Sequence, residues 1–337
     1  MALPSYVIRI IMVAAYAALA PDLGGNARAN AEPLLQLEAR IPLDDVRGRI
    51  DHMTVDLARH RLFVAALGND SVAVVDLQSR RLDRQIGKLP EPQGVGYVPA
   101  TDTLFVANAG DGSVRLFKGA DLSPSGRIEL GSDADNVRVD AGAGRVLIGH
   151  GDGALTIVDA TAQTKIASVA LKAHPESFQL DGNTGRIFIN LPDREAIAVV
   201  DAASAKEIAS WSTGGKRANF AMALDGARQR VLVAFRHPAQ VGVFAAADGT
   251  LITSISTCGD VDDVFVDARR DRVYLSCGEG FVDVLAADGA AYRRVAHIAT
   301  AGGARTSLFV PELDRLILAV PARSGSAAAI WIYRPSP

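Results

Sequence analysis

The segment RLFVAA, at Arg61–Ala66, is followed after a short polar stretch by SVAVVD, at Ser71–Asp76. Both segments are apolar, and the intervening Gly68-Asn69-Asp70 has the composition of a tight turn. Short apolar runs bounded by turn residues are typical of β-strands that are covered on both faces. The pattern therefore predicts two strands joined by a hairpin turn.

Six further segments repeat the run that begins at Arg61. They begin at Thr103, Arg145, Arg186, Arg230, Arg272 and Arg315, in steps of 42, 42, 41, 44, 42 and 43 residues. A period of about 40–45 residues with several short strands in each copy is typical of a β-propeller blade. We therefore predict an all-β fold, a seven-bladed β-propeller with four-stranded antiparallel blades.

The last copy lacks a fourth strand, because only RPSP follows its third strand at residues 329–333. Near the other end of the chain, Leu34–Pro42 has the pattern of a strand but belongs to no copy. We expect this N-terminal strand to close the last blade, with Leu35, Leu37 and Ile41 or their alternates buried. Closure of this kind covers a sheet edge that would otherwise be free.

An Asp–x4–Arg pattern recurs at the first turn of five copies. We interpret it as turn chemistry, with an ion pair across the turn as a further option. The pairs are Asp56/Arg61, Asp140/Arg145, Asp181/Arg186, Asp225/Arg230 and Asp267/Arg272.

Residues 1–31 have the pattern of a secretory signal peptide. Arg9 precedes the apolar run Ile10–Ala20, and the segment ends in Ala29-Asn30-Ala31, an A-x-A cleavage site. The apolar run is shorter than the about 20 residues needed to cross a bilayer, and a retained anchor is the alternative. We expect a signal peptide at 1–31 and a single propeller domain at 32–337. The mature protein would be periplasmic or secreted, with no membrane span after signal cleavage.

Charge and composition narrow the class of possible partners. The formal charge of -3 and the aromatic content of 6% predict no nucleic-acid partner.

Cys258 and Cys277 are the only cysteines. We expect them to form a disulfide, because both lie at the same face of one predicted blade and export favours oxidation. A free thiol and a metal pair with His237 are the alternatives.

Two segments carry a resemblance to a known family. Phe105–Asn108 followed by Gly112–Phe117, and also Arg61–Asp76, look like the YVTN repeat. Over about residues 34–334 the chain resembles the YncE-like, YVTN-type seven-bladed propeller proteins of bacteria. The resemblance implies the fold and leaves the function open, since related propellers include lactonases, amine-dehydrogenase heavy subunits and proteins of no known activity.

The starts of the innermost strands are the best candidates for a functional site. Polar residues occupy six of the seven aligned starts, which are Asp51, Gln93, Asp135, Glu176, Phe220, Asp262 and Arg305. Because these starts converge on the channel axis, we expect a polar ligand or metal site at this mouth. A hydrated mouth without a ligand is the alternative. The residues expected to bind the ligand are Glu176, Arg217, Asn219, Asp262, Asp263 and Arg305. The arginines would hold an anion, and the carboxylates a cation or a polyol.

The resulting hypothesis is an exported propeller that binds a small polar ligand, a metal or a protein partner, and we expect a monomer. The alternative is a metal-dependent lactonase-like hydrolase that uses the same mouth. Some propeller lactonases hold a divalent cation with Glu, Asn and Asp side chains, and Glu176, Asn136, Asn219 and Asp262 could imitate such a set. His52 is the candidate catalytic base if the protein is an enzyme. A channel-lining histidine is the other interpretation of His52.

Overall fold

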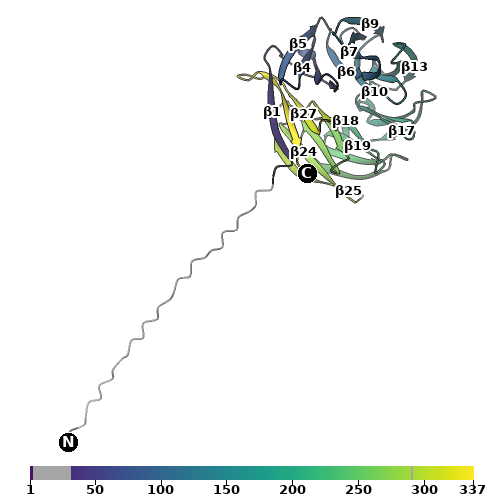
Figure 1. Ribbon diagram of the computed structural model, residues 1–337. Helices are drawn as coiled ribbons and strands as arrows, with labels where there is room; N and C mark the ends of the chain where they lie inside the picture. The colour runs from purple at the N-terminus through teal and green to yellow at the C-terminus, as the bar shows by residue number, and fades with distance from the viewer. Residues whose placement is uncertain (3–31, 290) are drawn as a thin grey trace. The chain divides into compact units, whose positions relative to one another are not determined.

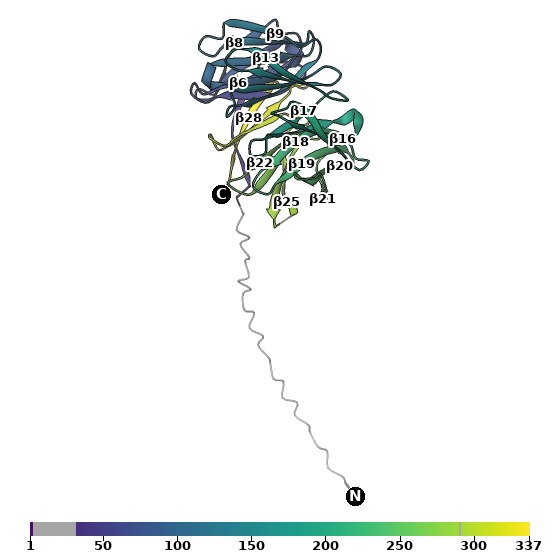
Figure 2. The same ribbon diagram turned by 90° about the vertical axis from the view of Figure 1, so that its right-hand side faces the viewer.

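A computed structural model describes residues 1–2, 32–289 and 291–337, so the expected signal peptide at 1–31 lies almost wholly outside the described residues. Residues Pro33–Pro337 form one compact unit. Its described residues form 28 strands, which make seven sheets of four strands each. Figures 1 and 2 show these sheets following one another along the chain around a common centre. The predicted all-β, seven-bladed propeller is confirmed.

Each sheet runs from an innermost to an outermost strand. The innermost strands are β2 (Met53–Asp56), β6 (Pro92–Val98), β10 (Ala134–Asp140), β14 (Phe178–Asp181), β18 (Arg217–Asp225), β22 (Val261–Asp267) and β26 (Ser307–Val310). The second strands are β3 (Arg61–Ala66), β7 (Thr103–Asn108), β11 (Arg145–His150), β15 (Arg186–Leu191), β19 (Arg230–His237), β23 (Arg272–Cys277) and β27 (Arg315–Val320).

The outer half of each sheet completes the blade. The third strands are β4 (Ser71–Asp76), β8 (Ser113–Lys118), β12 (Ala154–Asp159), β16 (Ala196–Asp201), β20 (Ala239–Ala245), β24 (Phe281–Asp288) and β28 (Ala328–Pro335). The outermost strands are β5 (Arg81–Gly87), β9 (Pro124–Glu129), β13 (Thr164–Ala170), β17 (Lys206–Ser212), β21 (Leu251–Ser256), β25 (Ala291–Ala299) and β1 (Leu35–Leu43). Short 3-10 turns lie at Leu67–Asn69, Pro99–Thr101 and Pro192–Arg194.

The hydrophobic core consists of seven clusters, and each lies between two adjacent blades. Phe63 of β3, for example, packs in the same cluster as Leu104 of β7. Six of the second strands bury every residue after the first, because neighbouring blades cover both of their faces. This packing explains why the repeated runs are continuously apolar rather than alternating.

Strand β1 closes the ring by pairing antiparallel with β28, as expected, so that the last sheet has the order β1-β28-β27-β26. Leu35, Ile41 and Leu43 of β1 are buried. Leu37 is 40% exposed, because the register shifts between Leu37 and Ala39 and turns this side chain away from the core. The innermost strands contact one another from blade to blade, and β26 contacts β2.

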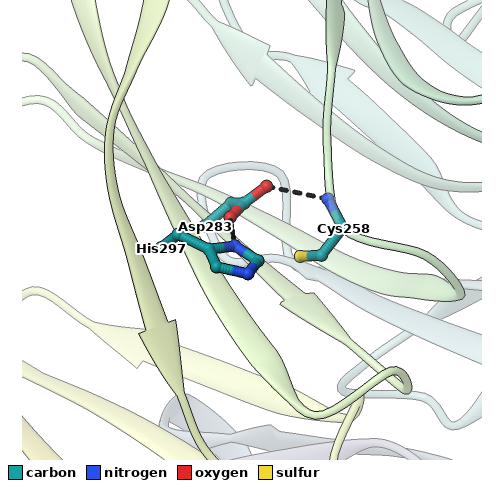
Figure 3. A group of neighbouring side chains, drawn as sticks. All are labelled: Cys258, Asp283 and His297. Carbon is teal, nitrogen blue, oxygen red and sulfur yellow. Dashed lines mark hydrogen bonds and ion pairs between the residues drawn. The ribbon is translucent and has the colours of Figure 1, made fainter.

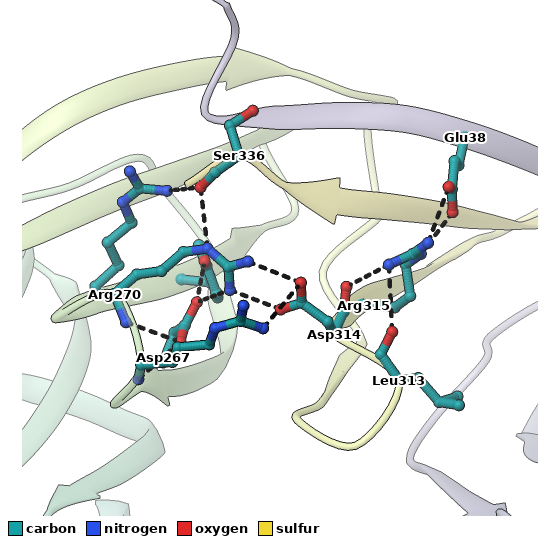
Figure 4. Close-up of polar contacts among 10 residues, drawn as sticks. Glu38, Asp267, Arg270, Leu313, Asp314, Arg315 and Ser336 are labelled. Carbon is teal, nitrogen blue, oxygen red and sulfur yellow. Dashed lines mark hydrogen bonds and ion pairs between the residues drawn. The ribbon is translucent and has the colours of Figure 1, made fainter.

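Charged side chains reinforce the closure (Figure 4). Arg315 of β27 binds Glu38 of β1, with 2.9 Å between Nη2 and Oε1. Arg270 of blade six binds Asp314 of blade seven through two hydrogen bonds of 2.6 and 2.7 Å. The Nε of Arg270 also donates to the carbonyl oxygen of Ser336, at 3.0 Å. Blade six, blade seven and both ends of the propeller domain are thus tied together.

The Asp–x4–Arg pattern makes an ion pair across the turn in only one of its five copies, Asp140 with Arg145 at 2.7 Å. Three other aspartates pair with an arginine three residues later, in Asp56–Arg59, Asp225–Arg228 and Asp267–Arg270. The fourth, Asp181, accepts a hydrogen bond from Thr184. In three of these four copies the arginine five residues on reaches instead to the next blade, as Arg61 does to the carbonyl oxygen of Gly119 at 2.8 Å. The pattern shapes the turns and joins blades.

The predicted disulfide is confirmed. Cys258, which precedes β22, is bonded to Cys277 at the end of β23, and their Cα atoms are 5.9 Å apart. Both cysteines are buried. Among the residues that the structure describes, no helix has the length and apolar character needed to cross a membrane.

Two substitutions in β1 test the closure. Ile41→Ala removes a fully buried side chain and should lower the free energy of unfolding by about 2–5 kcal/mol. Leu37→Ala changes a side chain of the same strand that is largely exposed, and should cost less than about 1 kcal/mol. Chemical denaturation measures both. Equal effects would show that β1 does not carry the closure.

A second stability prediction concerns the disulfide. Thiol titration of the unfolded, unreduced protein should detect no free cysteine. The Cys258→Ala/Cys277→Ala protein should lose roughly 3 kcal/mol of unfolding free energy, because the bond closes a loop with a sequence separation of 19 residues. Wild-type protein treated with a reductant should lose a similar amount. Two titratable thiols in the untreated protein would rule out the bond.

Candidate functional site

The central channel contains a cavity of about 390 Å³ that is lined by residues from all seven innermost strands. Apolar side chains share its wall with polar side chains, which are those of His52, Thr54, Arg138, Gln179, Asp263 and Ser307. A volume of this size lies in the range of pockets that hold small molecules, which begins at about 300 Å³.

Four carboxylates meet at one mouth of this channel. Asp51, Asp135, Glu176 and Asp262 line a smaller hollow together with His52. They come from blades one, three, four and six, because the equivalent position of each blade faces the same opening. Asp51 and Asp135 are almost completely buried. The mouth is therefore acidic and largely removed from solvent.

Burial and mutual repulsion change the protonation of these groups. Burial raises the pKa of Glu176 to about 8, and the negative charge of Asp135 adds to the shift. Burial likewise raises the pKa of Asp51 to about 6, although His52 and Arg49 oppose the shift. Deeper in the channel, burial raises the pKa of Asp263 to about 7. Glu176 and Asp263 are therefore partly protonated near neutral pH.

Two histidines lie among the carboxylates. The Nε2 atom of His52 is 3.7 Å from Asp51 and 3.9 Å from Asp135, which places the imidazole between two acidic groups. His174, in the loop before β14, has its Nε2 atom 3.6 Å from Asp135. This contact with Asp135 raises the pKa of His174 to about 9. Both imidazoles are thus held close to carboxylates at the mouth.

Two arginines at the rim are already neutralised. Arg305 binds Asp260 and Asp262 with separations of 2.9 and 3.0 Å. Arg236 binds the same two aspartates with separations of 3.0 and 2.6 Å, and its guanidinium lies 4.2 Å from the ring centre of Phe220. Two positive and two negative charges form a closed network, so an anionic ligand would have to compete with Asp260 and Asp262 for Arg305.

Arg138 is a channel residue that sequence reasoning missed. It projects from β10 into the same cavity as His52, and its Nη1 atom donates to the carbonyl oxygen of Val137 at 3.0 Å. Burial lowers its pKa, and the charges of Asp263 and Asp135 oppose that shift. The signal in the sequence is one arginine inside an inner strand, ADNVRVD, between the apolar residues Val137 and Val139.

The structure brings five of the predicted site residues to the mouth or the channel, and places the other two elsewhere. His52, Glu176, Asp262, Asp263 and Arg305 line the pockets of this end.

The remaining two lie apart from these pockets. Asn219 is fully buried and donates from Nδ2 to Asn190 at 3.2 Å and to the carbonyl oxygen of Ala196 at 3.0 Å. These bonds tie blade five to blade four. Arg217 is exposed at the start of β18, opposite His237 in the register.

A second cluster of potential ligands lies away from the channel (Figure 3). Asp283 of β24 is fully buried and accepts hydrogen bonds from the amide of Cys258 at 2.8 Å and from His297 Nδ1 at 2.6 Å. Arg294 also binds Asp283, at 3.1 Å. Because the sulfur of Cys258 belongs to the disulfide and Asp283 is fully paired, this group fixes the turn before β22.

No family model and no curated protein matches the chain. Solved structures do share its fold. A chain of the hydrazine synthase of Kuenenia stuttgartiensis has a TM-score of 0.74 and 14% sequence identity, over 85% of this chain and 97% of that one. A chain of the mitotic checkpoint complex has a TM-score of 0.73 and 14% identity, over 98% and 99%. At such identities the likeness shows the seven-bladed propeller alone, and the YncE-like resemblance stays a prediction.

The raised pKa of Glu176 makes stability depend on pH. A carboxyl group with a higher pKa in the folded protein stabilises the fold fully below its unfolded pKa, and this contribution is lost as the pH rises through the folded value. For Glu176 this window runs from 4.5 to about 8. We expect the melting temperature, measured with a chelator present, to fall between pH 5 and pH 8, partly because of Glu176.

Glu176→Gln is neutral at every pH, so its melting temperature should fall less steeply than that of the wild type. Glu312→Gln, a change at an exposed glutamate, serves as the control. Identical pH slopes for wild type and Glu176→Gln would contradict the assignment.

Proposed function

We propose that this protein is exported and binds a small polar ligand at the mouth of its central channel. In this proposal residues 1–31 are a signal peptide and residues 32–337 are the mature propeller domain. A buried disulfide between Cys258 and Cys277 is compatible with export, because such bonds persist in oxidising compartments.

The observation that carries the ligand proposal is the convergence of Asp51, Asp135, Glu176 and Asp262 on one buried hollow. Burying carboxylates costs free energy unless they are paired and hydrogen-bonded. Asp262 and Asp51 are each paired with arginine, so this cost falls mainly on Asp135 and Glu176. None of these four residues belongs to the seven apolar clusters between the blades. The buried oxygens Asp135 Oδ1 and Asn136 Oδ1 have no hydrogen-bond partner. A ligand that supplies donors or positive charge would offset this cost.

The charges also suggest the chemistry of the ligand. The acidic mouth favours hydroxyl, amino or cationic groups, whereas Arg138 inside the channel favours a carboxylate or another anion. We assign the anion to Arg138 rather than to Arg305, because Arg305 is paired with Asp260 and Asp262. A small hydroxy acid fits both regions if its carboxylate binds Arg138 inside the channel and its hydroxyl groups lie at the acidic mouth.

One observation favours hydrolysis as a second candidate function. His52 lies between Asp51 and Asp135, and carboxylates in these positions orient an imidazole that removes a proton from water. A lactonase-like hydrolase would use this histidine as the base and a cation at the carboxylates to polarise the carbonyl. Turnover of lactones or esters that is lost in His52→Ala would support this candidate.

Calorimetry with a panel of small hydroxy acids, including tartrate and gluconate, tests the binding proposal. At least one member should bind with a one-to-one stoichiometry. Arg138→Gln should weaken that affinity about tenfold or more, since a hydrogen bond to a charged group contributes about 1.5–3 kcal/mol.

Arg217→Ala is the matched control, because it removes a positive charge that is exposed outside the pockets of the mouth. It should leave the affinity unchanged. Binding that depends on Arg217 and ignores Arg138 would place the ligand elsewhere, and no binding by any member of the panel would count against a hydroxy acid as the ligand.

A further inference from the structure

Three side chains at the acidic mouth offer ligand atoms to one point. Asp135 stands at the start of β10, and His174 and Glu176 come from the loop between β13 and β14. One oxygen or nitrogen atom from each lies within 4.8 Å of the other two. The Nε2 atom of His174 and the Oδ2 atom of Asp135 are 3.6 Å apart. Two ligands of a tetrahedral zinc ion are about 3.3 Å apart, given bond lengths of about 2.0–2.1 Å.

The loop that carries two of these side chains is held in place. The Nδ1 atom of His174 lies 2.7 Å from the carbonyl oxygen of Gly151. Pro175 is buried and packs closely against Gly149. The amide of Glu176 donates to the carbonyl oxygen of Asn190 at 3.0 Å. These contacts position the loop, so little ordering is required when a ligand binds.

The hydrogen bond from His174 Nδ1 also decides which nitrogen can coordinate. With one proton on Nδ1 directed at Gly151, it is Nε2, on the side of Asp135, that can lose its proton to a metal ion and offer a lone pair. Metal-binding histidines commonly donate their other ring N–H to a backbone carbonyl in this way. The orientation of His174 is therefore that of a metal ligand.

A separate observation points to a bound cation. Asp135 is only 5% exposed, and its Oδ1 atom has no hydrogen-bond partner. The neighbouring Asn136 is also buried and likewise leaves its Oδ1 atom without a partner. Buried oxygen acceptors without partners are uncommon in folded proteins, and a cation satisfies them without a donor hydrogen.

The backbone of Asp135 is fixed from the other side. Gly94 of β6 lies so close that a Cβ atom there would be 1.9 Å from the carbonyl oxygen of Asp135. Any larger residue at position 94 would displace Asp135 and break the arrangement. The contact between the inner strands of blades two and three therefore fixes the position of Asp135.

We propose that Asp135, His174 and Glu176 bind a divalent transition-metal cation of the zinc or manganese type at the channel mouth. One imidazole nitrogen and two carboxylates form a donor set that suits these ions better than Ca²⁺ or Mg²⁺, which prefer oxygen ligands alone. This inference rests on the proposed function in one respect, because both place the ligand at the same mouth. The cation would neutralise the acidic cluster and leave coordination positions for the hydroxyl groups of a small ligand.

Zinc titration of chelator-treated, full-length mature protein tests the inference. Isothermal calorimetry with ZnCl₂ alone should show one saturable site, with weaker binding of CaCl₂ and MgCl₂. His174→Ala and Asp135→Asn should each weaken zinc affinity at least about tenfold. Loss of a residue that only hydrogen-bonds to a metal ligand already lowers metal affinity by about tenfold or more. Glu176→Gln keeps the shape of the side chain and provides a third variant if either of the others fails to fold.

His297→Ala is the matched control, since His297 binds a carboxylate in the cluster around the disulfide and lies away from the channel. It should leave zinc affinity unchanged. Replacing zinc by Co²⁺ adds a spectroscopic readout, because visible absorption bands should appear with wild type and change with His174→Ala. A wild type without a saturable site, or zinc binding that depends on His297 and not on His174, would overturn the inference.

The test separates this inference from the proposed function. Hydroxy acids that bind to chelator-treated protein, with no zinc site, would support the proposed function and overturn the metal site. Zinc binding that depends on His174, with no hydroxy acid bound in its presence, would support the metal site and count against the proposed ligand.

Discussion

The pairing of β1 with β28 is the interaction on which the rest of the structure depends. Every blade packs against two neighbours, so the apolar faces of the first and last blades are covered only when the ring closes. The closure joins residues about 300 positions apart in the chain, as in the pair Leu35↔Pro335. It also holds β26 against β2, which brings Arg305 and His52 to the same mouth.

A closed ring creates a position at which charges can be concentrated. The strand starts of seven blades face one opening, so one acidic residue in each of several blades produces a dense cluster such as Asp51, Asp135 and Glu176. Burial raises the pKa values of Asp51 and Glu176, and the repulsion between neighbouring carboxylates adds to the shift. The apolar packing between blades thus stabilises the fold, and the charges held together at the mouth lower that stability.

The mouth divides into two regions with different roles. On one side, Arg236 and Arg305 neutralise Asp260 and Asp262 in a closed network. On the other, Asp135 lies close to the imidazoles of His52 and His174 and within range of the charge of Arg138, and one of its oxygens has no hydrogen-bond partner. His52 lines both the hollow formed by this second region and the cavity that contains Arg138.

The sequence by itself determined the number of blades, the closing strand and the disulfide, because each depends on local strand patterns repeated at a regular spacing. It also located the mouth, since Asp51, Glu176 and Asp262 are equivalent positions of the repeat. The tertiary structure alone decided that Asn219 is buried between blades, that Arg305 is paired and that Arg138 enters the channel. Those outcomes depend on which side chain of a neighbouring blade lies opposite, and contacts between blades have no fixed spacing in the chain.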